Sequence, residues 1–596
     1  MDIPKTPESR DSPQDGYVSL KVLPSLAARL TDILRTAGPM LPPTTSAPGQ
    51  ESGTTPDTSL RLLITRALLT DEWEDSVEAR LSEASAMFNM PAPWAHALLE
   101  AGIEKWFADV WETWDFKSAA ELASHLTNPS MAPTNATPGG SPFAPPDLVK
   151  ATATWLADIE FDHPPTILDF ADGTGALTVG LVHALLTSDL YPAQNLIEGL
   201  RLVYDDRVRL DIACVVVARA FEKSLPDSPQ DILDRIRGVA VCEDASTWAL
   251  STEEVFDLVV GTAPLGDRGT GTDAGEQTDD NSGEYLTAVI KTVADGGAGA
   301  AIAPSLVVTA TTGPMAGVRD RLLDRFNTVE FFNYDLSPEP LLGPGDWMAR
   351  TVVRMQTAGT GSVTTTPIMR WKPDRRAIVV NDPPRTTLYQ PPPLGRHSFV
   401  PRIGSDMEKR LVDSVIAHQT NRWNLVEVQR TYGDHRNEED AFSVGLTADN
   451  RFSIALTTPR IYFGKAPAAG ARFGVKPVEP GLGDPALAVM LSRTALWWWF
   501  ATSDGRHVRQ EHITEPLSWL RLLSQDELDL GGEISEAWRE AAISAKTMDP
   551  ESAEARDAAS RRSRLITEFE QVLLANLGTS ASDSREFLSR TSFRSV

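Results

Sequence analysis

The sequence has few of the residues that build crosslinked or membrane-embedded proteins. Its 596 residues include only two cysteines, Cys214 and Cys242, which argues against a disulfide framework or a zinc site. Both stand among apolar residues, so we expect two buried structural thiols. No apolar run approaches the roughly 18 residues of a membrane span, and the first residues lack a basic-then-apolar signal. We therefore expect a cytoplasmic protein without membrane contact.

Positive charge is also scarce. The chain has 55 Lys and Arg against 82 Asp and Glu, a net charge of −27. Contacts to phosphates need clustered Lys and Arg, so this balance argues against a protein that coats nucleic acid nonspecifically. The balance reverses in residues 366–510, where Lys and Arg outnumber Asp and Glu. A basic region inside an acidic chain permits a DNA-facing cleft.

The most informative stretch reads as a strand, a glycine turn and a helix. Residues 166–168 are apolar or β-favouring and lead to Asp169, and a helical pattern covers 176–186. Between them lie Gly173 and Gly175, whose lack of side chains lets a ligand approach the backbone. This is the first unit of a doubly wound α/β domain, with the ligand expected at the carboxyl end of the strand.

Further strands follow at regular intervals. The second predicted strand, 200–204, is followed by Asp205 and Asp206. An acidic residue at this place commonly holds the ribose hydroxyls of a nucleotide-like ligand. The residues alone leave open which of the two does so, and a solvated turn carboxylate is the alternative. The other predicted strands of this domain are 239–242, 255–260, 297–305, 329–334 and 350–355.

Three blocks together resemble a known family. They read G-S-P-F-A-P at 140–145, D-F-A-D-G-T-G at 169–175 and T-A-P-L at 262–265. In this order and spacing they resemble the N6-adenine DNA methyltransferases, above all the modification subunits of type I restriction systems and the fused type II enzymes. That family has roughly G-x-F-F-T-P, D-P-A-C-G-T-G and N-P-P-F/Y. The resemblance implies a class I S-adenosylmethionine-dependent methyltransferase domain, a Rossmann-like α/β fold.

The resemblance implies S-adenosylmethionine as cofactor and double-stranded DNA as partner, with a further restriction or defence subunit as a second partner. It places an acidic residue after the third strand, here Asp244, at the adenine amino group of the cofactor. Asp172 replaces the family's Cys and Ala144 its Thr, which weakens the expected cofactor affinity. The implied cofactor-binding residues are Phe143, Asp169, Gly173, Gly175, Asp205, Asp206 and Asp244.

The tetrapeptide that transfers the methyl group departs most from the family. There, an Asn side chain and a backbone carbonyl accept the adenine N–H groups, and an aromatic residue stacks on the flipped base. Here Thr262 has a short hydroxyl, Ala263 keeps only its carbonyl, Pro264 is retained and Leu265 has no aromatic face. Losing a positioned acceptor costs on the order of 10²–10³ in rate. We expect methyl transfer to be impaired or lost.

The tail of the basic region resembles, more distantly, the target-recognition regions of fused type II enzymes. We interpret residues 497–500, Trp-Trp-Trp-Phe, as a packed core helix, and take Arg506 and Arg509 as candidate phosphate contacts. No metal-binding acid cluster stands out. An apolar helix face at 565–577 is expected to pack on its own domain or on a partner subunit.

The predicted organisation combines these segments. The acidic, glycine-rich stretch 267–284 is expected to be disordered without a partner, as are the residues from 579 onward. The expected domains are a mostly disordered 1–58, a helical N-terminal domain 59–130, the methyltransferase-like α/β domain 143–365, a Pro-rich linker 366–400, a DNA-recognition-like domain 400–525 and C-terminal helices 530–578.

Three functions remain open from the sequence. The leading hypothesis is an N6-adenine DNA methyltransferase-like protein with a degenerate transfer site, a DNA- or cofactor-binding component of a restriction-modification or phage-defence system. The second is an active S-adenosylmethionine-dependent DNA adenine methyltransferase, alone or with a partner subunit. The third is a methyltransferase for a non-DNA substrate, which the acidic charge favours.

Overall fold

The computed structural model describes residues 144–590 with internal gaps, and a few isolated positions before 144. The gaps that concern the site are 171–174, 264–273 and 504–509. The predicted segments 1–58 and 59–130 therefore lie outside the described residues, apart from those isolated positions.

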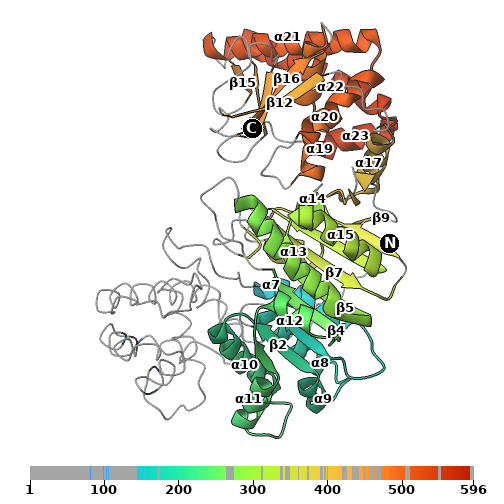
Figure 1. Ribbon diagram of the computed structural model, residues 1–596. Coiled ribbons are helices and arrows are strands. Elements are labelled where there is room, and N and C mark those ends of the chain that lie inside the picture. The colour runs from blue at the N-terminus through green and yellow to red at the C-terminus, as the bar shows by residue number, and fades with distance from the viewer. Residues whose placement is uncertain are drawn as a thin grey trace, which may run out of the picture. The chain divides into compact units, whose positions relative to one another are not determined.

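The described strands form a nine-stranded sheet in the order β3-β2-β1-β4-β5-β7-β6-β8-β9 (Figure 1). The pairs from β3 through β5 are parallel. The strands are β1 (Ile167–Phe170), β2 (Leu200–Tyr204), β3 (Ala240–Cys242), β4 (Phe256–Thr262), β5 (Val293–Pro304), β6 (Thr328–Tyr334), β7 (Arg350–Gln356), β8 (Ser362–Thr365) and β9 (Thr386–Leu388).

This strand order confirms the predicted α/β class and the class I methyltransferase-like sheet. The chain runs outward from β1 to β3 and then returns to β4 on the other side of β1. The reversal between β1 and β4 is the topological switch point, beside which doubly wound folds bind ligands at the carboxyl ends of the strands. Central strands of such sheets are buried on both faces, and every residue of β1 is buried.

Helices connect the parallel strands and supply the rest of the core. α7 packs on α8, α8 on α10 and α10 on α11, whereas α12 packs on α13. The helices of this part are α7 (Pro146–Ala157), α8 (Ala176–Thr187), α9 (Ala193–Glu198), α10 (Arg207–Phe221), α11 (Pro229–Gly238), α12 (Ala245–Ser251) and α13 (Ala274–Thr292).

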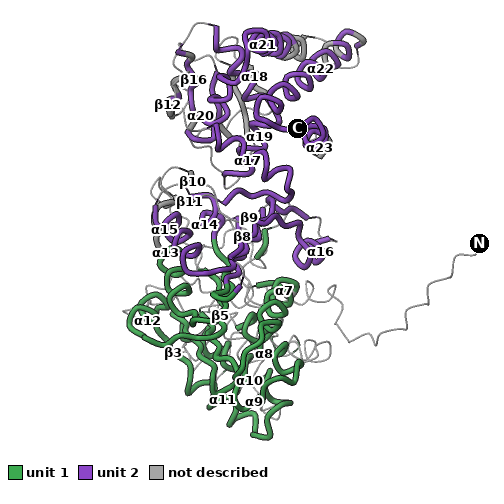
Figure 2. The backbone as a smooth tube through the Cα atoms, turned by 90° about the vertical axis from the view of Figure 1, so that its right-hand side faces the viewer, with its two compact units in different colours: residues 1–303, 339–347, 356–358 green, residues 304–338, 348–355, 359–596 purple. Residues whose placement is uncertain are grey.

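The chain divides into two compact units (Figure 2). Unit 1 comprises residues 1–303, 339–347 and 356–358, and unit 2 comprises 304–338, 348–355 and 359–596. Unit 2 also holds a five-stranded antiparallel sheet in the order β12-β16-β13-β14-β15. Its strands are β12 (Val426–Tyr432), β13 (Phe442–Leu446), β14 (Phe452–Leu456), β15 (Ile461–Phe463) and β16 (Ala471–Pro477), and a short pair is formed by β10 (Pro393–Leu394) and β11 (His397–Ser398).

Helices make up the remainder of unit 2. The buried apolar face of α22 packs on α21, which confirms the first of the two surfaces expected for it. The helices are α14 (Leu306–Thr309), α15 (Gly313–Arg325), α16 (Arg376–Asn381), α17 (Asp406–His418), α18 (Gly483–Leu491), α19 (Arg493–Thr502), α20 (Glu511–Ser518), the 3₁₀ helix η5 (Trp519–Leu522), α21 (Gln525–Thr547), α22 (Ala553–Asn576) and α23 (Ala581–Arg590). None of the described helices combines the length and apolarity that a membrane crossing requires.

The predicted disorder from residue 579 onward is wrong for the described part of that segment, because α23 occupies 581–590. Ser580 begins the helix, and its hydroxyl accepts a hydrogen bond from Asp583 N at 3.1 Å. Phe587 is fully buried, with its ring edge-on to Trp497 at 5.7 Å between centroids. Phe587 and the ion pair between Asp583 and Arg410 of α17, at 2.7 Å, hold the helix to its unit.

Two further predictions are corrected by the elements present. The acidic stretch 267–284 was expected to be disordered, but its part from Ala274 onward forms the first turns of α13. Extending a helix costs less free energy than nucleating one, so the apolar second half of α13 stabilises these turns. The Pro-rich segment 366–400 is not only a linker, because it contains α16 and β9. β9 pairs with β8 in the large sheet, and the prolines flank this edge strand without interrupting it.

Candidate functional site

The carboxyl ends of β1 and β4 bring two of the three sequence blocks together. Phe170, the last residue of β1, pairs with Gly261 of β4. The glycine turn that follows β1 and the Thr262–Ala263 segment that ends β4 therefore leave the sheet at the same edge. Gly175 begins α8 with a φ of +77°, and a Cβ there would lie 3.3 Å from Ala213 Cβ of α10. Both the backbone and the packing require glycine at this position.

Asp169 fixes the framework of this edge from inside the sheet. Its side chain is fully buried, and its Oδ2 accepts hydrogen bonds from Thr178 Oγ1 at 2.7 Å and Tyr204 Oη at 2.9 Å. Thr178 belongs to α8 and Tyr204 to β2, so one carboxylate joins both elements to β1. Asp169 thus positions the turn between β1 and α8, while its direct contact with a cofactor stays a prediction.

The two acidic residues after β2 differ in their surroundings. Asp206 Oδ1 accepts a hydrogen bond from Arg209 N at 3.1 Å, the arrangement of a residue that caps the first turn of α10. Asp205 is exposed directly after β2. The sequence could not separate the two, because a capping acid and a ligand-binding acid both follow a strand. Of the two, Asp205 is the carboxylate that the structure leaves exposed.

At the end of β3, Asp244 is the N-cap of α12. Its Oδ1 accepts hydrogen bonds from Thr247 N at 2.8 Å and Thr247 Oγ1 at 2.9 Å, and the side chain is exposed.

Cys242, the last residue of β3, is exposed, which contradicts the predicted pair of buried thiols. β3 is the outermost strand on its side of the sheet, so its last residue has no strand beyond it. Cys214 is buried as predicted, and burial raises its thiol pKa to about 12.

The end of β4 is enclosed. Thr262 and Ala263 have no exposed surface. Thr262 pairs with Ile302 of β5, and Ala263 N donates a hydrogen bond to Ile302 O at 2.8 Å. The β4–β5 ladder therefore continues one residue beyond β4, and a proline in place of Ala263 would lack the N–H that makes this bond.

A tyrosine that the sequence analysis did not identify lies over the paired ends of β1 and β4. Tyr285 of α13 is buried, and its Oη donates a hydrogen bond to Phe170 O at 2.5 Å. The hydroxyl passes over Gly261, where a Cβ would lie only 1.9 Å from it. The sequence does not reveal the contact between Tyr285 and Gly261, because only the fold brings these two residues together.

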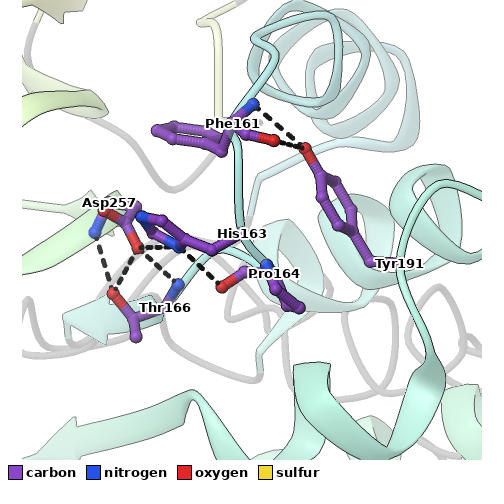
Figure 3. A network of polar contacts seen from close by, with 6 residues as sticks. All are labelled: Phe161, His163, Pro164, Thr166, Tyr191 and Asp257. Carbon is purple, nitrogen blue, oxygen red and sulfur yellow. Dashed lines mark hydrogen bonds and ion pairs between the residues drawn. The ribbon is translucent and has the colours of Figure 1, made fainter.

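The opposite, amino edge of the same two strands has its own polar network (Figure 3). Thr166 N and Oγ1 each donate a hydrogen bond to Asp257 Oδ2 at 2.8 Å, and Asp257 N donates to Thr166 Oγ1 at 3.0 Å. The exposed His163 lies with its Nδ1 3.8 Å from the same carboxylate oxygen. These contacts hold the register of β1 against β4 and so determine which residues reach the carboxyl edge.

Of the remaining predicted residues, the structure describes the tryptophans of α19, and several others lie outside the described residues. Trp497, Trp498 and Trp499 are buried in α19, which confirms a core helix over a base-stacking platform. Within the described ranges, no cluster of His, Cys, Asp and Glu has the makings of a metal site. Phe143, Gly173, Pro264, Leu265, Arg506 and Arg509 lie outside the described residues.

Comparison with known proteins gives similarity at the level of solved structures. No protein-family profile matches the sequence, and no curated protein matches it. The DrdV–DNA complex has a TM-score of 0.45 at 8% identity, covering 89% of this chain and 73% of that one. The type I restriction-modification system methyltransferase subunit from Streptococcus thermophilus has a TM-score of 0.32 at 13% identity, covering 58% and 81%.

The ATP-dependent Type ISP restriction-modification enzyme LlaBIII bound to DNA is also similar, with a TM-score of 0.41 at 9% identity. The match covers 87% of this chain, which spans only 48% of the length of LlaBIII. Assignment of the fold class rests on the strand order of this chain, a doubly wound sheet with its switch point between β1 and β4.

Proposed function

We propose that this protein is a component of a restriction-modification or phage-defence system that binds S-adenosylmethionine and double-stranded DNA, and whose own methyl transfer to adenine N6 is impaired or lost. One observation carries the proposal. The position where the related tetrapeptide has its amide acceptor holds Thr262, which is fully enclosed at the end of β4.

The chemistry of adenine methylation explains why this position matters. The amino lone pair is delocalised into the ring, so an enzyme must accept hydrogen bonds from the amino group to free that pair for attack on the methyl group. An asparagine presents a planar amide oxygen for this purpose. The Thr262 hydroxyl is shorter and enclosed, and the next residue is bound into the sheet through Ala263 N. An acceptor lost in this way costs on the order of 10²–10³ in rate.

The cofactor half of the site, unlike the transfer half, has the groups that its expected ligand, a ribose-bearing molecule, requires. Exposed carboxylates follow β2 and β3, at Asp205 and Asp244, on the sheet edge where such ligands bind. Asp205 would accept from the ribose hydroxyls, and Asp244 and Phe143 would lie on the adenine side. The turn that contains Gly173 and ends at Gly175 would approach the cofactor through its backbone. When bound, S-adenosylmethionine supplies the electrophilic methyl group.

Calorimetric titration of the full chain with S-adenosylmethionine tests this half of the proposal. We expect the wild type to bind and Asp205→Ala to bind about tenfold or more weakly, because a hydrogen bond to a charged group contributes about 1.5–3 kcal/mol. Asp162→Ala is the matched control, since Asp162 is also exposed but precedes β1 at the opposite edge. Equal affinities of the two variants, or no binding by the wild type, would contradict the assigned pocket.

The proposal assigns Arg506 and Arg509 to DNA phosphates, as the sequence analysis does.

The second function left open by the sequence, an active adenine methyltransferase, requires Thr262 to serve as acceptor, alone or after a partner rearranges the end of β4. Measuring methyl incorporation separates that alternative from the proposal. The acidic net charge of −27 favours the third alternative, a non-DNA substrate, whereas the spacing of the three sequence blocks speaks against it.

A further inference from the structure

One face of β6 in unit 2 carries aromatic rings covered by arginines. Alternate residues of a strand point to the same face, which groups Glu330, Phe332 and Tyr334. Arg354 of β7 and Arg385, just before β9, both lie over the Phe332 ring, with guanidinium carbons 4.7 and 5.3 Å from its centroid. Two guanidinium groups, one from β7 and one from the segment before β9, therefore share one ring.

The row continues beyond β6. Trp371 lies edge-on to Tyr334 at 5.8 Å, and the guanidinium of Arg376 is 5.0 Å from the Trp371 ring. Arg370 lies over Phe500 of α19 at 5.5 Å. We call the arginines of this row, together with the neighbouring exposed Arg375, the arginine face: Arg354, Arg370, Arg375, Arg376 and Arg385.

Three of the rings are covered, and the arginines other than Arg354 reach solvent, whereas Arg354 is 8% exposed. Phe332, Tyr334 and Trp371 are 3%, 2% and 4% exposed, so an unstacked base has no free ring to stack on. In contrast, the side chains of Arg370 and Arg385 are 55% and 41% exposed. A ligand of this face would meet guanidinium groups whose stems are already held by packing, so little side-chain entropy is lost on binding.

The carboxylates on this face do not neutralise it. Arg385 Nη1 is 3.4 Å and Arg354 Nη1 is 3.9 Å from Glu330 oxygens, and Arg370 pairs with Asp335. The five arginines of the face outnumber the two carboxylates of these ion pairs, so the face keeps a positive charge. Each guanidinium has five N–H donors, so an arginine that meets a carboxylate on one edge can donate to a phosphate from the other.

We propose that the arginine face binds the phosphate backbone of duplex DNA without reading its sequence, at a site formed by β6, β7, α16 and the segment before β9. The buried rings exclude recognition by base stacking, and the fork geometry of arginine matches phosphate oxygens. The choice of DNA as the polyanion rests on the proposed function. The site is separate in sequence from Arg506 and Arg509, and it gives the basic region 366–510 a second contact with DNA.

The test measures how binding to a fluorescent random-sequence duplex depends on salt, from about 50 to 200 mM KCl. The variant Arg370→Gln/Arg375→Gln/Arg385→Gln should bind more weakly and show a shallower log–log salt slope, by about one unit for each arginine that contacts a phosphate. The single variant Arg375→Gln leaves the ring contacts intact, so weaker binding by this variant cannot be attributed to misfolding caused by their loss. It should show a smaller change of the same sign.

Arg564→Gln provides the matched control, because Arg564 is an exposed arginine of α22 in the same unit. If the triple variant retains the wild-type affinity and slope, the arginine face is not a DNA site, although the proposed function stands. If the wild type binds no duplex at all, both the face and the DNA-binding part of the proposed function are wrong. The wild type should also bind a single-stranded oligonucleotide no more tightly than the duplex; tighter single-strand binding would contradict backbone recognition.

Discussion

Acidic side chains that the sequence assigns to one ligand perform different tasks in the fold. Asp169 is buried and joins β1 to α8 and β2 through Thr178 and Tyr204. Asp206 and Asp244 use an oxygen to cap helices, and Asp205 is left exposed at the edge of the sheet. Sequence patterns locate acids after strands, but only the geometry tells which of them a helix end has already engaged.

At the residue scale, the buried carboxyl of Glu570 is the other informative titratable group. It belongs to α22 and is fully buried, and its Oε1 accepts a hydrogen bond from Arg493 N in the first turn of α19. Its Oε2 lies 3.6 Å from Arg493 Nε. Burial outweighs these favourable contacts and raises the pKa of Glu570 from 4.5 to about 7.

This shift predicts how stability depends on pH. Because the folded chain holds the proton more tightly than the unfolded chain, the contribution of Glu570 is fully present below pH 4.5 and is lost as the pH rises through about 7. The shift corresponds to a loss of about 3 kcal/mol in the free energy of unfolding. Glu570→Gln mimics the neutral form, so urea unfolding of this variant should lack that decline.

Urea titrations of both proteins between pH 5 and 8 make the comparison, with the difference in unfolding free energy as the readout. The variant should gain on the wild type as the pH rises. Parallel pH profiles would mean that Glu570 titrates with an ordinary pKa in the folded protein.

At the scale of elements, the sequence predicts the central sheet well and its margins poorly. β2 begins and ends where expected, because its mostly buried apolar residues stand between turn residues. β9, the start of α13 and α23 were missed, because their sequences are proline-rich, acidic or serine-rich. Each is held by pairing or packing with a distant segment, as β9 is by β8, and local composition does not encode such contacts.

In the candidate site, too, the sequence predicts the strands but not the contacts between distant segments. The chain order of the blocks predicts the β1–β4 edge, but the role of Tyr285 depends on the crossing of α13 over Gly261. The Oη–Phe170 O bond joins the end of β1 to α13 directly beside the transfer segment. A helix residue thereby fixes the distance between the two strand ends at which a cofactor and a target would meet.

This coupling is testable with a double-mutant cycle. Gly261→Ala should destabilise the protein by about 1–3 kcal/mol, since its Cβ would lie 1.9 Å from Tyr285 Oη and 2.6 Å from Phe170 O. In the Tyr285→Phe background the nearer obstacle is gone, so the same substitution should cost about 1 kcal/mol less. Unfolding free energies of the four proteins give the coupling. Strictly additive losses would contradict the contact between Tyr285 and Gly261.

At the scale of the whole molecule, the two units divide the proposed tasks. Unit 1 contains the carboxyl edge of β1 to β4, with the candidate cofactor carboxylates and the enclosed Thr262. Unit 2 contains the arginine face, the five-stranded sheet and the C-terminal helices. We propose that this protein keeps the methyltransferase framework and has lost the acceptor needed for transfer to adenine.

Methyl transfer from labelled S-adenosylmethionine to mixed genomic DNA tests that claim most directly. The wild type would be compared with Thr262→Asn/Leu265→Phe, which restores the amide and the aromatic ring, and with Thr262→Ser as a control for changes at the enclosed position. We expect no incorporation by the wild type or the control, and measurable incorporation by the restored variant. Incorporation by the wild type would contradict the account and make T-A-P-L a working transfer site.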